Sequence, residues 1–237
     1  LRWIALVIPL PFLLLAALRP NQPPPVVIPG AFHWRNSTYL SGEEHHAIQQ
    51  NGIQRVYFKM LDIDWSPAHG AHPVSVVLPS YQWNSRHERS GEWTRSVGLV
   101  PCIYITNNTF TKLDEKGVAD LAAKLLRKLR MSAPRHIDGV LLDCDWTATT
   151  RARFFALTRL MTDSLDVPVS ATIRLHQYAN PKGTGTPPAD RGMLMVYTVG
   201  QLTMHSATNS IFDEGAATPY FRRETPYPLA LDIALPA

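Results

Sequence analysis

The stretch His136-Ile-Asp-Gly-Val-Leu-Leu-Asp-Cys-Asp-Trp-Thr147 carries an apolar run directly into two carboxylates. The continuous run from Val140 to Leu142 is typical of a parallel strand covered on both faces. Because side chains alternate along a strand, the pattern places Asp143 and Asp145 on one face and Cys144 on the other. Two carboxylates on one face of a buried strand raise the free energy of the fold unless they are solvated, paired with a cation or part of a functional site. We interpret the stretch as the centre of a functional site; alternatively, Asp145 caps the following helix.

Strands and helices alternate along the rest of the chain. Predicted strands cover 26–39, 55–65, 99–106, the central stretch, 167–176, 193–199 and 228–235, and predicted helices cover 41–51, 113–131, 149–165 and 209–222. Ser41 and Glu44 have the spacing of a capping box. Residues 66–98 have no clear period and predict a long loop or an extra hairpin around 74–78. The alternation predicts an α/β fold with a parallel sheet, a (β/α)8 TIM-type barrel without its last β/α unit, either truncated or open on one side.

The N-terminal residues differ in composition from the rest of the 237-residue chain. Arg2 precedes an almost unbroken apolar run from Trp3 to Leu18, and the segment 21–25 is rich in proline. This pattern predicts a signal peptide or membrane anchor with a spacer at 1–25, and a single barrel domain at 26–237. We therefore expect an exported protein, periplasmic or extracellular, that meets the membrane only through this segment.

Charge and cysteine usage argue against several other classes of protein. The formal net charge is +4. The basic residues that cluster on the predicted helix 113–131 are interpreted as its solvated face, so no nucleic-acid partner is expected. The two cysteines, Cys102 and Cys144, give neither a metal-ligand spacing nor a disulfide framework. They can pair only if their strands are neighbours, and their expected opposite orientations disfavour a disulfide. No metal or cofactor is expected.

Polar side chains are expected to converge inside the barrel. On each strand we assigned the more apolar alternate residues to the outer, helix-covered face, which leaves the other set pointing inward. The inward set is Lys59, Tyr104, Asp143, Asp145, Arg174, His176, Tyr197 and Asp232. Barrel interiors are normally packed with apolar residues, so a polar layer indicates an active site. The alternative is a structural ion-pair network in which Arg174 and Lys59 neutralise Asp143 and Asp232.

Two of the predicted strands resemble those of the family-18 glycoside hydrolases. That family ends its fourth strand with Asp-x-Asp-x-Glu after Asp-Gly, and its sixth strand carries Met-x-Tyr-Asp. Here Asp143-Cys-Asp-Trp-Thr147 and Met195-Val-Tyr-Thr198 stand at those places. The resemblance implies that Asp145 supports substrate-assisted attack and that Tyr197 bonds the sugar. However, Thr147 replaces the Glu that is the general acid of that family.

Four further segments resemble an uncharacterised family of exported bacterial proteins with glycosidase-like barrels. These are Leu142-Asp-Cys-Asp-Trp-Thr147, Ser170-Ala-Thr-Ile-Arg-Leu-His-Gln177, Asp190-Arg-Gly-Met-Leu-Met195 and Leu229-Ala-Leu-Asp-Ile-Ala-Leu-Pro236. This similarity covers most of the chain after the N-terminal segment. It implies the barrel but brings no activity with it.

The favoured functional prediction is a glycoside hydrolase that acts on a polysaccharide outside the cytoplasm. Glycosidic cleavage needs two carboxyl groups, and the candidates are Asp143, Asp145 and Asp232. The alternative is a non-catalytic carbohydrate-binding or scaffold protein that has lost the acid, as Thr147 indicates. The residues predicted to contact the sugar are Trp34, Lys59, Tyr104, Trp146, Arg174, His176 and Tyr197. For the tryptophans, core or rim packing is the competing interpretation.

Overall fold

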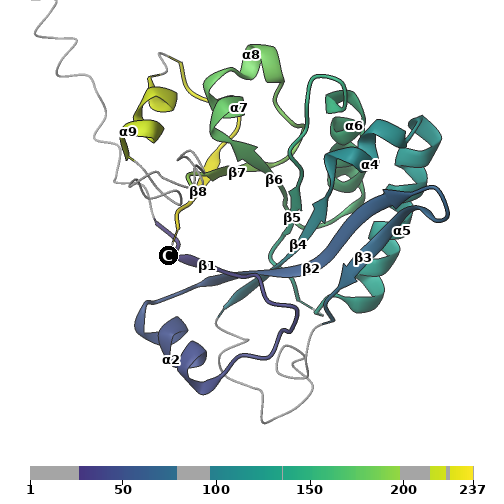
Figure 1. Ribbon diagram of the computed structural model, residues 1–237. Coiled ribbons are helices and arrows are strands. Elements are labelled where there is room, and N and C mark those ends of the chain that lie inside the picture. Colours follow the sequence, from purple (N-terminus) through teal and green to yellow (C-terminus); the bar gives the residue numbers. More distant parts are fainter. Residues whose placement is uncertain (1–26, 79–96, 135, 198–213, 223–224, 237) are drawn as a thin grey trace, which may run out of the picture.

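The structure, a computed structural model, describes residues 27–78, 97–134, 136–197, 214–222 and 225–236, and its main feature is one curled sheet (Figure 1). Seven parallel strands follow one another through the sheet in sequence order within these residues. They are β1 (Gly30–His33), β2 (Arg55–Ser66), β4 (Gly98–Ile105), β5 (Val140–Asp143), β6 (Val169–Arg174), β7 (Arg191–Met195) and β8 (Leu231–Ala234). β1 and β8 are the two ends of this path and do not pair with each other. The α/β prediction is therefore confirmed as a parallel half-barrel.

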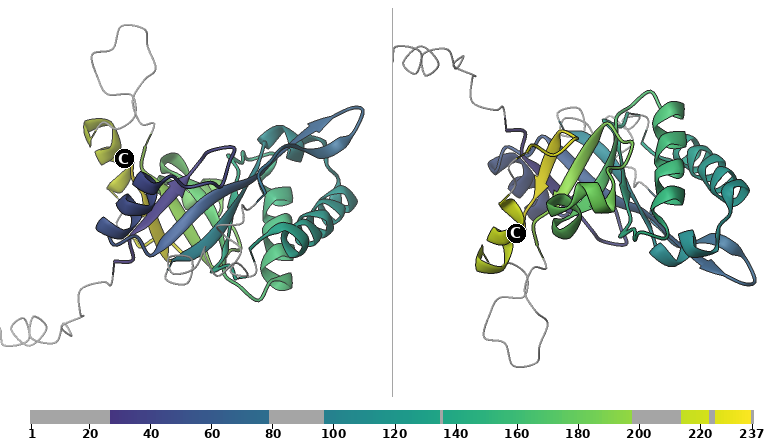
Figure 2. Two further views of the ribbon diagram at one scale, coloured as in Figure 1. Left: turned by 90° about the horizontal axis from the view of Figure 1, so that it is seen from below. Right: turned by 90° about the horizontal axis from the view of Figure 1, so that it is seen from above.

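An eighth strand forms a hairpin with the longest strand of the sheet. β3 (Gly70–Val76) runs antiparallel to the second half of β2, from Ser66 opposite Gly70 to Leu61 opposite Val76. Gly70 has φ 64°, a left-handed conformation that glycine adopts without strain and that suits the tight turn. Figure 2 shows the hairpin projecting as an arm beyond the sheet. The predicted hairpin exists, a few residues earlier than expected, and residues 79–96 lie outside the described part of the chain.

Helices connect the strands and cover the convex face of the sheet. They are α2 (Gly42–Gln50), α4 (Asn107–Lys112), α5 (Glu115–Ser132), α6 (Arg151–Ser164), α7 (Leu175–Ala179), α8 (Pro181–Thr184), α9 (Glu214–Ala217) and the 3-10 helix η2 (Thr218–Phe221). The long helices α5 and α6 lie side by side (Figures 1 and 2). Of the predicted helix at 209–222, the structure describes only the two short helices after residue 213.

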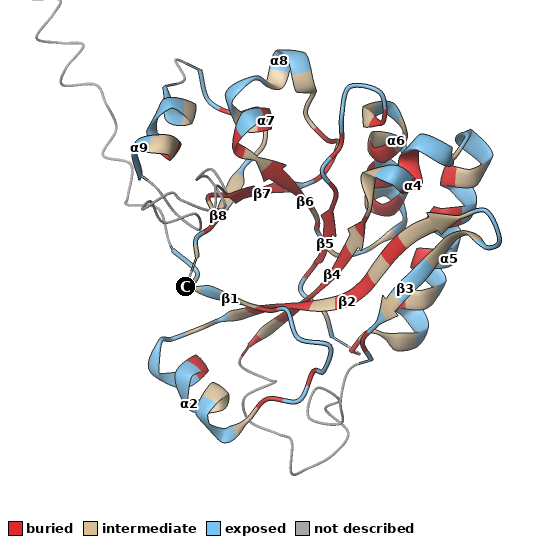
Figure 3. Cartoon of the chain, in the orientation of Figure 1, coloured by how far each residue is buried: buried red, intermediate tan, exposed pale blue. Residues whose placement is uncertain are grey.

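Two apolar clusters occupy the two faces of the sheet. The larger lies between the sheet and the helices and includes Phe58, Ile103, Leu142 and Ile173, none of them exposed. Figure 3 shows β5, β6 and β7 as mostly buried, with exposed residues on the helices that surround the sheet. The smaller cluster lies on the concave face, which we call the interior. It consists of Tyr57, Val100, Cys102, Leu141, Met193, Met195 and Ala234. The predicted alternation is therefore confirmed on β4, β5 and β7.

The capping box predicted at the start of α2 is present. The backbone N–H of Ser41 donates to Glu44 Oε2 at 2.8 Å, and the Glu44 N–H donates to Ser41 Oγ at 3.2 Å. Replacing Ser41 with alanine leaves one helix N–H without this acceptor. We expect this change to lower the free energy of unfolding by about 0.5–2 kcal/mol, measured by urea denaturation. A loss below about 0.2 kcal/mol would show that the cap contributes nothing to stability.

Two other expectations concern the N-terminal segment and the cysteines. The predicted signal or anchor at 1–25 lies outside the described residues. Among the residues that are described, no helix is long and apolar enough to cross a bilayer. Cys102 and Cys144 are both free and buried, the first in the interior cluster and the second in the outer one. Their opposite orientations keep the two thiols apart, as the alternation of the strands predicted.

Candidate active site

Asp143 is the last residue of β5 and lies on the interior face, where only 8% of it is exposed. One carboxylate oxygen, Oδ1, accepts a hydrogen bond from Thr172 Oγ1 at 2.8 Å and a longer one from Arg174 Nη2 at 3.4 Å. Burial raises the pKa of this carboxyl, and the Arg174 charge and the Thr172 hydrogen bond oppose the rise only in part. Asp143 thus holds a proton more readily than an exposed aspartate does.

A bulge in β2 turns Asp62 toward the interior. The register against β4 passes from Lys59 opposite Cys102 to Leu61 opposite Ile103, so Met60 is the extra residue. Beyond the bulge Asp62 lies opposite Tyr104, on the same face as Lys59, and the two side chains form an ion pair of 2.5 Å. The inward position of Lys59 was predicted, whereas that of Asp62 was missed. Lys59 therefore pairs with Asp62 and not with Asp232.

Two tyrosines complete this group of interior side chains. Tyr104 lies opposite Asp143 in the register of β4 and β5, and Tyr197 follows β7. Burial and the neighbouring Asp143 raise the pKa of both phenols, so both keep their protons at neutral pH. The Tyr197 hydroxyl donates to Met195 Sδ at 3.2 Å. We call this group the Asp143 cluster: Lys59, Asp62, Tyr104, Asp143, Thr172, Arg174 and Tyr197.

Asp145 lies outside the strand and is exposed. β5 ends at Asp143, so the strand alternation that placed both carboxylates on one face does not continue to Asp145. Its charge still contributes to the raised pKa of Asp143, after the larger effect of burial. The alternative helix-capping role of Asp145 does not hold either, because the N-cap of α6 is Thr150 and makes no side-chain capping bond.

Thr147, which the sequence resemblance aligns with the family-18 acid, belongs to a small hydroxyl network. The Thr147 N–H donates to Thr150 Oγ1 at 2.9 Å, and its own hydroxyl lies 3.0 Å from Thr149 Oγ1. Thr150 Oγ1 in turn donates to Asn107 Oδ1. These bonds organise the turn before α6. A threonine hydroxyl donates hydrogen bonds but is too weak an acid to transfer its proton near neutral pH. This position therefore does not supply an acid catalyst.

Asp232 forms a two-bond ion pair that the sequence did not predict. Arg191 Nε and Nη2 donate to its two carboxylate oxygens at 3.0 and 2.6 Å. This fork-to-fork geometry is the strongest form of an arginine–carboxylate pair. The structural ion-pair alternative therefore holds for Asp232, with Arg191 as its partner. For Asp143 the predicted partner, Arg174, is confirmed.

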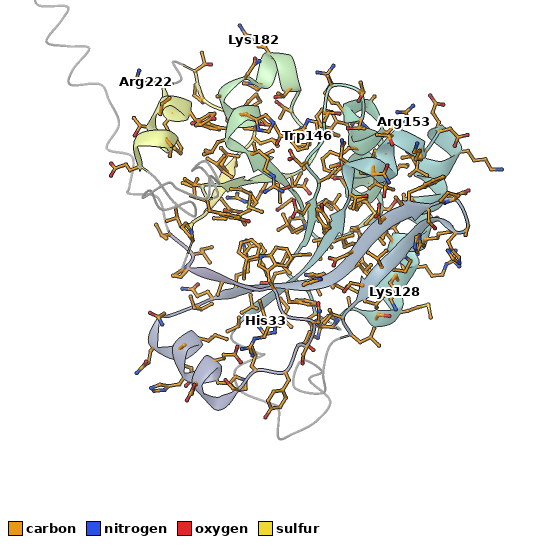
Figure 4. The ribbon with its side chains drawn as sticks, viewed as in Figure 1. His33, Lys128, Trp146, Arg153, Lys182 and Arg222 are labelled. Atoms are coloured by element: carbon orange, nitrogen blue, oxygen red, sulfur yellow. The ribbon has the colours of Figure 1, made fainter. Side chains whose placement is uncertain are left out.

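Two predicted sugar contacts lie elsewhere. β6 ends at Arg174, and His176 is exposed on α7, outside the strand on which its inward position was predicted. Trp146 is only 3% exposed; its ring stacks on Phe154 at 5.2 Å and its Nε1 donates to the Thr184 carbonyl at 3.1 Å. Figure 4 labels Trp146 in this region, between α6 and α8. Because the ring is buried, stacked and hydrogen-bonded, it has no free face for a sugar. The core-packing interpretation is therefore correct for Trp146.

Trp34 ends a ladder of aromatic rings on β1 and β2. Its ring stacks on Phe32 at 5.5 Å between centroids, and Phe32 stacks on Tyr57 at 4.8 Å. Phe32 and Tyr57 are partners in the register of the two strands and belong to the interior cluster. Trp34 itself is 42% exposed. Its ring is therefore held in place from one side and accessible to a ligand.

Comparisons with known proteins assign no family to this chain. No family model matches its sequence, and no curated protein matches it. In the described part of the chain, no group of three or more His, Cys, Asp or Glu side chains is arranged to hold a metal ion. The chemistry of the site must therefore be argued from the Asp143 cluster itself.

Proposed function

We propose that this protein is a glycoside hydrolase that acts on a polysaccharide outside the cytoplasm, with Asp143 as its proton donor. The observation that carries the proposal is the buried Asp143 carboxyl, whose pKa is raised, at the C-terminal end of the central strand. Glycosidases need a carboxylic acid that keeps its proton until it reaches the leaving oxygen. The C-terminal ends of parallel barrel strands are where such enzymes place their catalytic groups.

Two other carboxylates, Asp62 and Asp145, are available to act with Asp143. Asp62 and Asp143 both lie opposite Tyr104, on its two neighbouring strands, so their Cα atoms are about 9.5 Å apart, two strand spacings. Asp62 is held in place by its ion pair with Lys59. For this pair we propose an inverting reaction, in which a water molecule fits between the two carboxyls. In that reaction Asp62 activates the water, and Asp145, which is exposed beyond the end of β5, contacts the sugar.

The wider setting belongs to the same proposal. We take the curled sheet as seven strands of a (β/α)8 barrel, similar to the exported glycosidase-like proteins and distantly to the family-18 hydrolases. The apolar segment 3–18 supports export and a possible anchor. Thr147 stands where that family has its acid. We therefore propose that the proton comes from Asp143, four residues earlier at the end of β5, and that the mechanism differs from that of family 18.

The test is a reducing-end release assay with the full chain, kept soluble in a non-ionic detergent, on a panel of bacterial and plant polysaccharides. Turnover of at least one polymer is the expected result. A folded protein that releases no sugar from any polymer yet is retarded by one of them in an affinity gel would contradict the hydrolase and establish a binding protein. That second function is favoured by one observation, the threonine network at Thr147.

Trp34 is expected to contribute to polysaccharide binding through its exposed ring face. Trp34→Ala should weaken affinity about tenfold, equivalent to ~1.4 kcal/mol, because a large preorganised aromatic surface is lost. The measurement is affinity gel electrophoresis at several polymer concentrations. Phe221→Ala, which removes another exposed ring at 43% exposure on η2, is the control and should leave affinity unchanged. Equal affinities for wild type and Trp34→Ala would exclude this ring as a sugar platform.

A further inference from the structure

Arg174 and Arg191 both reach the interior, and their guanidinium groups are used very differently. Arg191 makes two short hydrogen bonds to Asp232, at 3.0 and 2.6 Å. Arg174 makes a single bond to Asp143 through Nη2, and at 3.4 Å it is longer than the 2.7–2.9 Å usual for a charged pair. Arg174 Nε is buried and has no hydrogen-bond partner among the described residues. Among the described residues, Arg191 is thus held by a two-bond ion pair, whereas Arg174 has one long bond and a buried Nε without an acceptor.

An unpaired donor in this position is costly unless a ligand uses it. A buried N–H without an acceptor loses its hydration and gains nothing in return. The backbone N–H of Arg174 donates to Gln177 Oε1 at 2.8 Å, which fixes the residue at the end of β6. Its side chain is 29% exposed, so part of it is accessible to a ligand. The group is therefore held in place, accessible and short of acceptors.

The charges around Arg174 point to an anionic ligand. Lys59 is neutralised by Asp62, and Arg191 by Asp232. The one ion-pair partner of Arg174 in the described part of the chain is Asp143. When Asp143 carries the proton that an acid catalyst needs, this partner is neutral. Within the Asp143 cluster, Arg174 is then the one cation without an ionised partner, and the two neighbouring tyrosines are neutral donors. Asp145 lies outside the cluster and is exposed to solvent.

We propose that Arg174 binds a carboxylate of the substrate and that the polysaccharide is a polymer of uronic acids. A guanidinium presents parallel N–H donors that match the two oxygens of a carboxylate, a geometry that Arg191 and Asp232 already show in this interior. Neutral sugars offer only hydroxyl groups, which leave the charge of Arg174 unpaired. The inference rests on the proposed function for the identity of the ligand as a polysaccharide.

The experiment measures binding separately from turnover. The full chain in non-ionic detergent is run in affinity gels that contain polygalacturonate, alginate or hyaluronate, each beside the same polymer after reduction of its carboxylates to hydroxymethyl groups. We expect retardation by at least one uronate polymer and a loss of affinity of about tenfold or more for its reduced form. No binding to any uronate, or equal binding to the reduced form, overturns the proposal.

Two variants assign the effect to this side chain. Arg174→Gln should lower affinity for the uronate polymer about tenfold or more and leave affinity for the reduced polymer unchanged. Arg159→Gln removes the same charge from the exposed face of α6 and should bind like the wild type. If Arg174→Gln fails to fold, judged by circular dichroism, Arg174→Lys keeps the charge without the planar fork and should lose part of the affinity. Wild-type binding by the folded Arg174 variant overturns the proposal.

The same samples separate this inference from the proposed function. Reducing ends are measured on the polymer that binds. Selective binding without sugar release leaves the uronate site standing and removes the hydrolase. Sugar release from a neutral polymer, with no preference for uronates, supports the hydrolase and overturns the role of Arg174.

Discussion

Asp143→Asn is expected to lower kcat for polysaccharide cleavage by about 10²–10⁴-fold, the usual contribution of a general acid. Asparagine has nearly the same shape and can still accept the hydrogen bond from Thr172, but it has no proton to give to the leaving oxygen. Because the amide preserves the contacts that hold the site together, KM should change much less than kcat. Initial rates of reducing-end release over a range of polymer concentrations give both constants.

The matched control is Asp163→Asn, which makes the same chemical change at an exposed position of α6. This variant should keep wild-type kcat and KM. Circular dichroism and thermal unfolding confirm that both variants are folded. A folded Asp143→Asn protein with more than about a tenth of the wild-type kcat would remove Asp143 from the role of proton donor.

Phe154→Ala is expected to lower the free energy of unfolding by about 3–5 kcal/mol. Phe154 is completely buried, stacks on Trp146 at 5.2 Å and meets Phe110 edge to face at 5.6 Å. Removing the ring leaves a cavity between α6, α4 and the strand ends, lined by aromatic groups that cannot collapse into it. A loss of this size exceeds a third of the stability of many domains.

Urea denaturation followed by tryptophan fluorescence measures this loss, and an unchanged m-value shows that both proteins unfold in the same way. Leu160→Ala is the control, because Leu160 lies on the same helix and is 38% exposed. It should change stability by no more than about 0.5 kcal/mol. A loss below about 1 kcal/mol for Phe154→Ala would show that the contacts behind the strand ends add little to stability.

The period-two alternation predicted the centre of the site because burial differs so strongly between the two faces of these strands. Tyr104, Asp143 and Arg174 belong to three different predicted strands, and the structure brings them together. The helices on the outer face require one set of alternate residues to be apolar, which leaves the other set for the interior. The inward positions of these three residues follow from that requirement alone.

The alternation failed where the strands end or slip. β5 and β6 end at Asp143 and Arg174, so Asp145 and His176 fall outside the regular pattern. The apolar residues next to them are not part of the strands. Trp146 packs on α6, and Leu175 is the first residue of α7. The bulge at Met60 has no glycine or proline to signal it, and it reverses the face of Asp62. The two aspartates at 62 and 64, which continue the opposite parity, were the one sign of it.

Partner choice among the charges lay beyond the sequence as well. Arg191 begins β7 and Asp232 lies on β8, 41 residues further along the chain. Their pairing depends on the register between Met193 and Asp232, which places Arg191 one inward position before its partner. The loop that precedes β7 gave no indication of where the strand begins, so the interior position of Arg191 could not be assigned.

The most direct test of the central claim is the titration of the Asp143 carboxyl by NMR, on protein labelled with ¹³C at the aspartate carboxyl carbons. Asp143→Asn identifies the resonance that belongs to this residue. We expect a pKa above that of an exposed aspartate, about 3.9, because burial outweighs the charge of Arg174. A pKa at or below that value would show that Arg174 holds Asp143 ionised, which contradicts its role as proton donor.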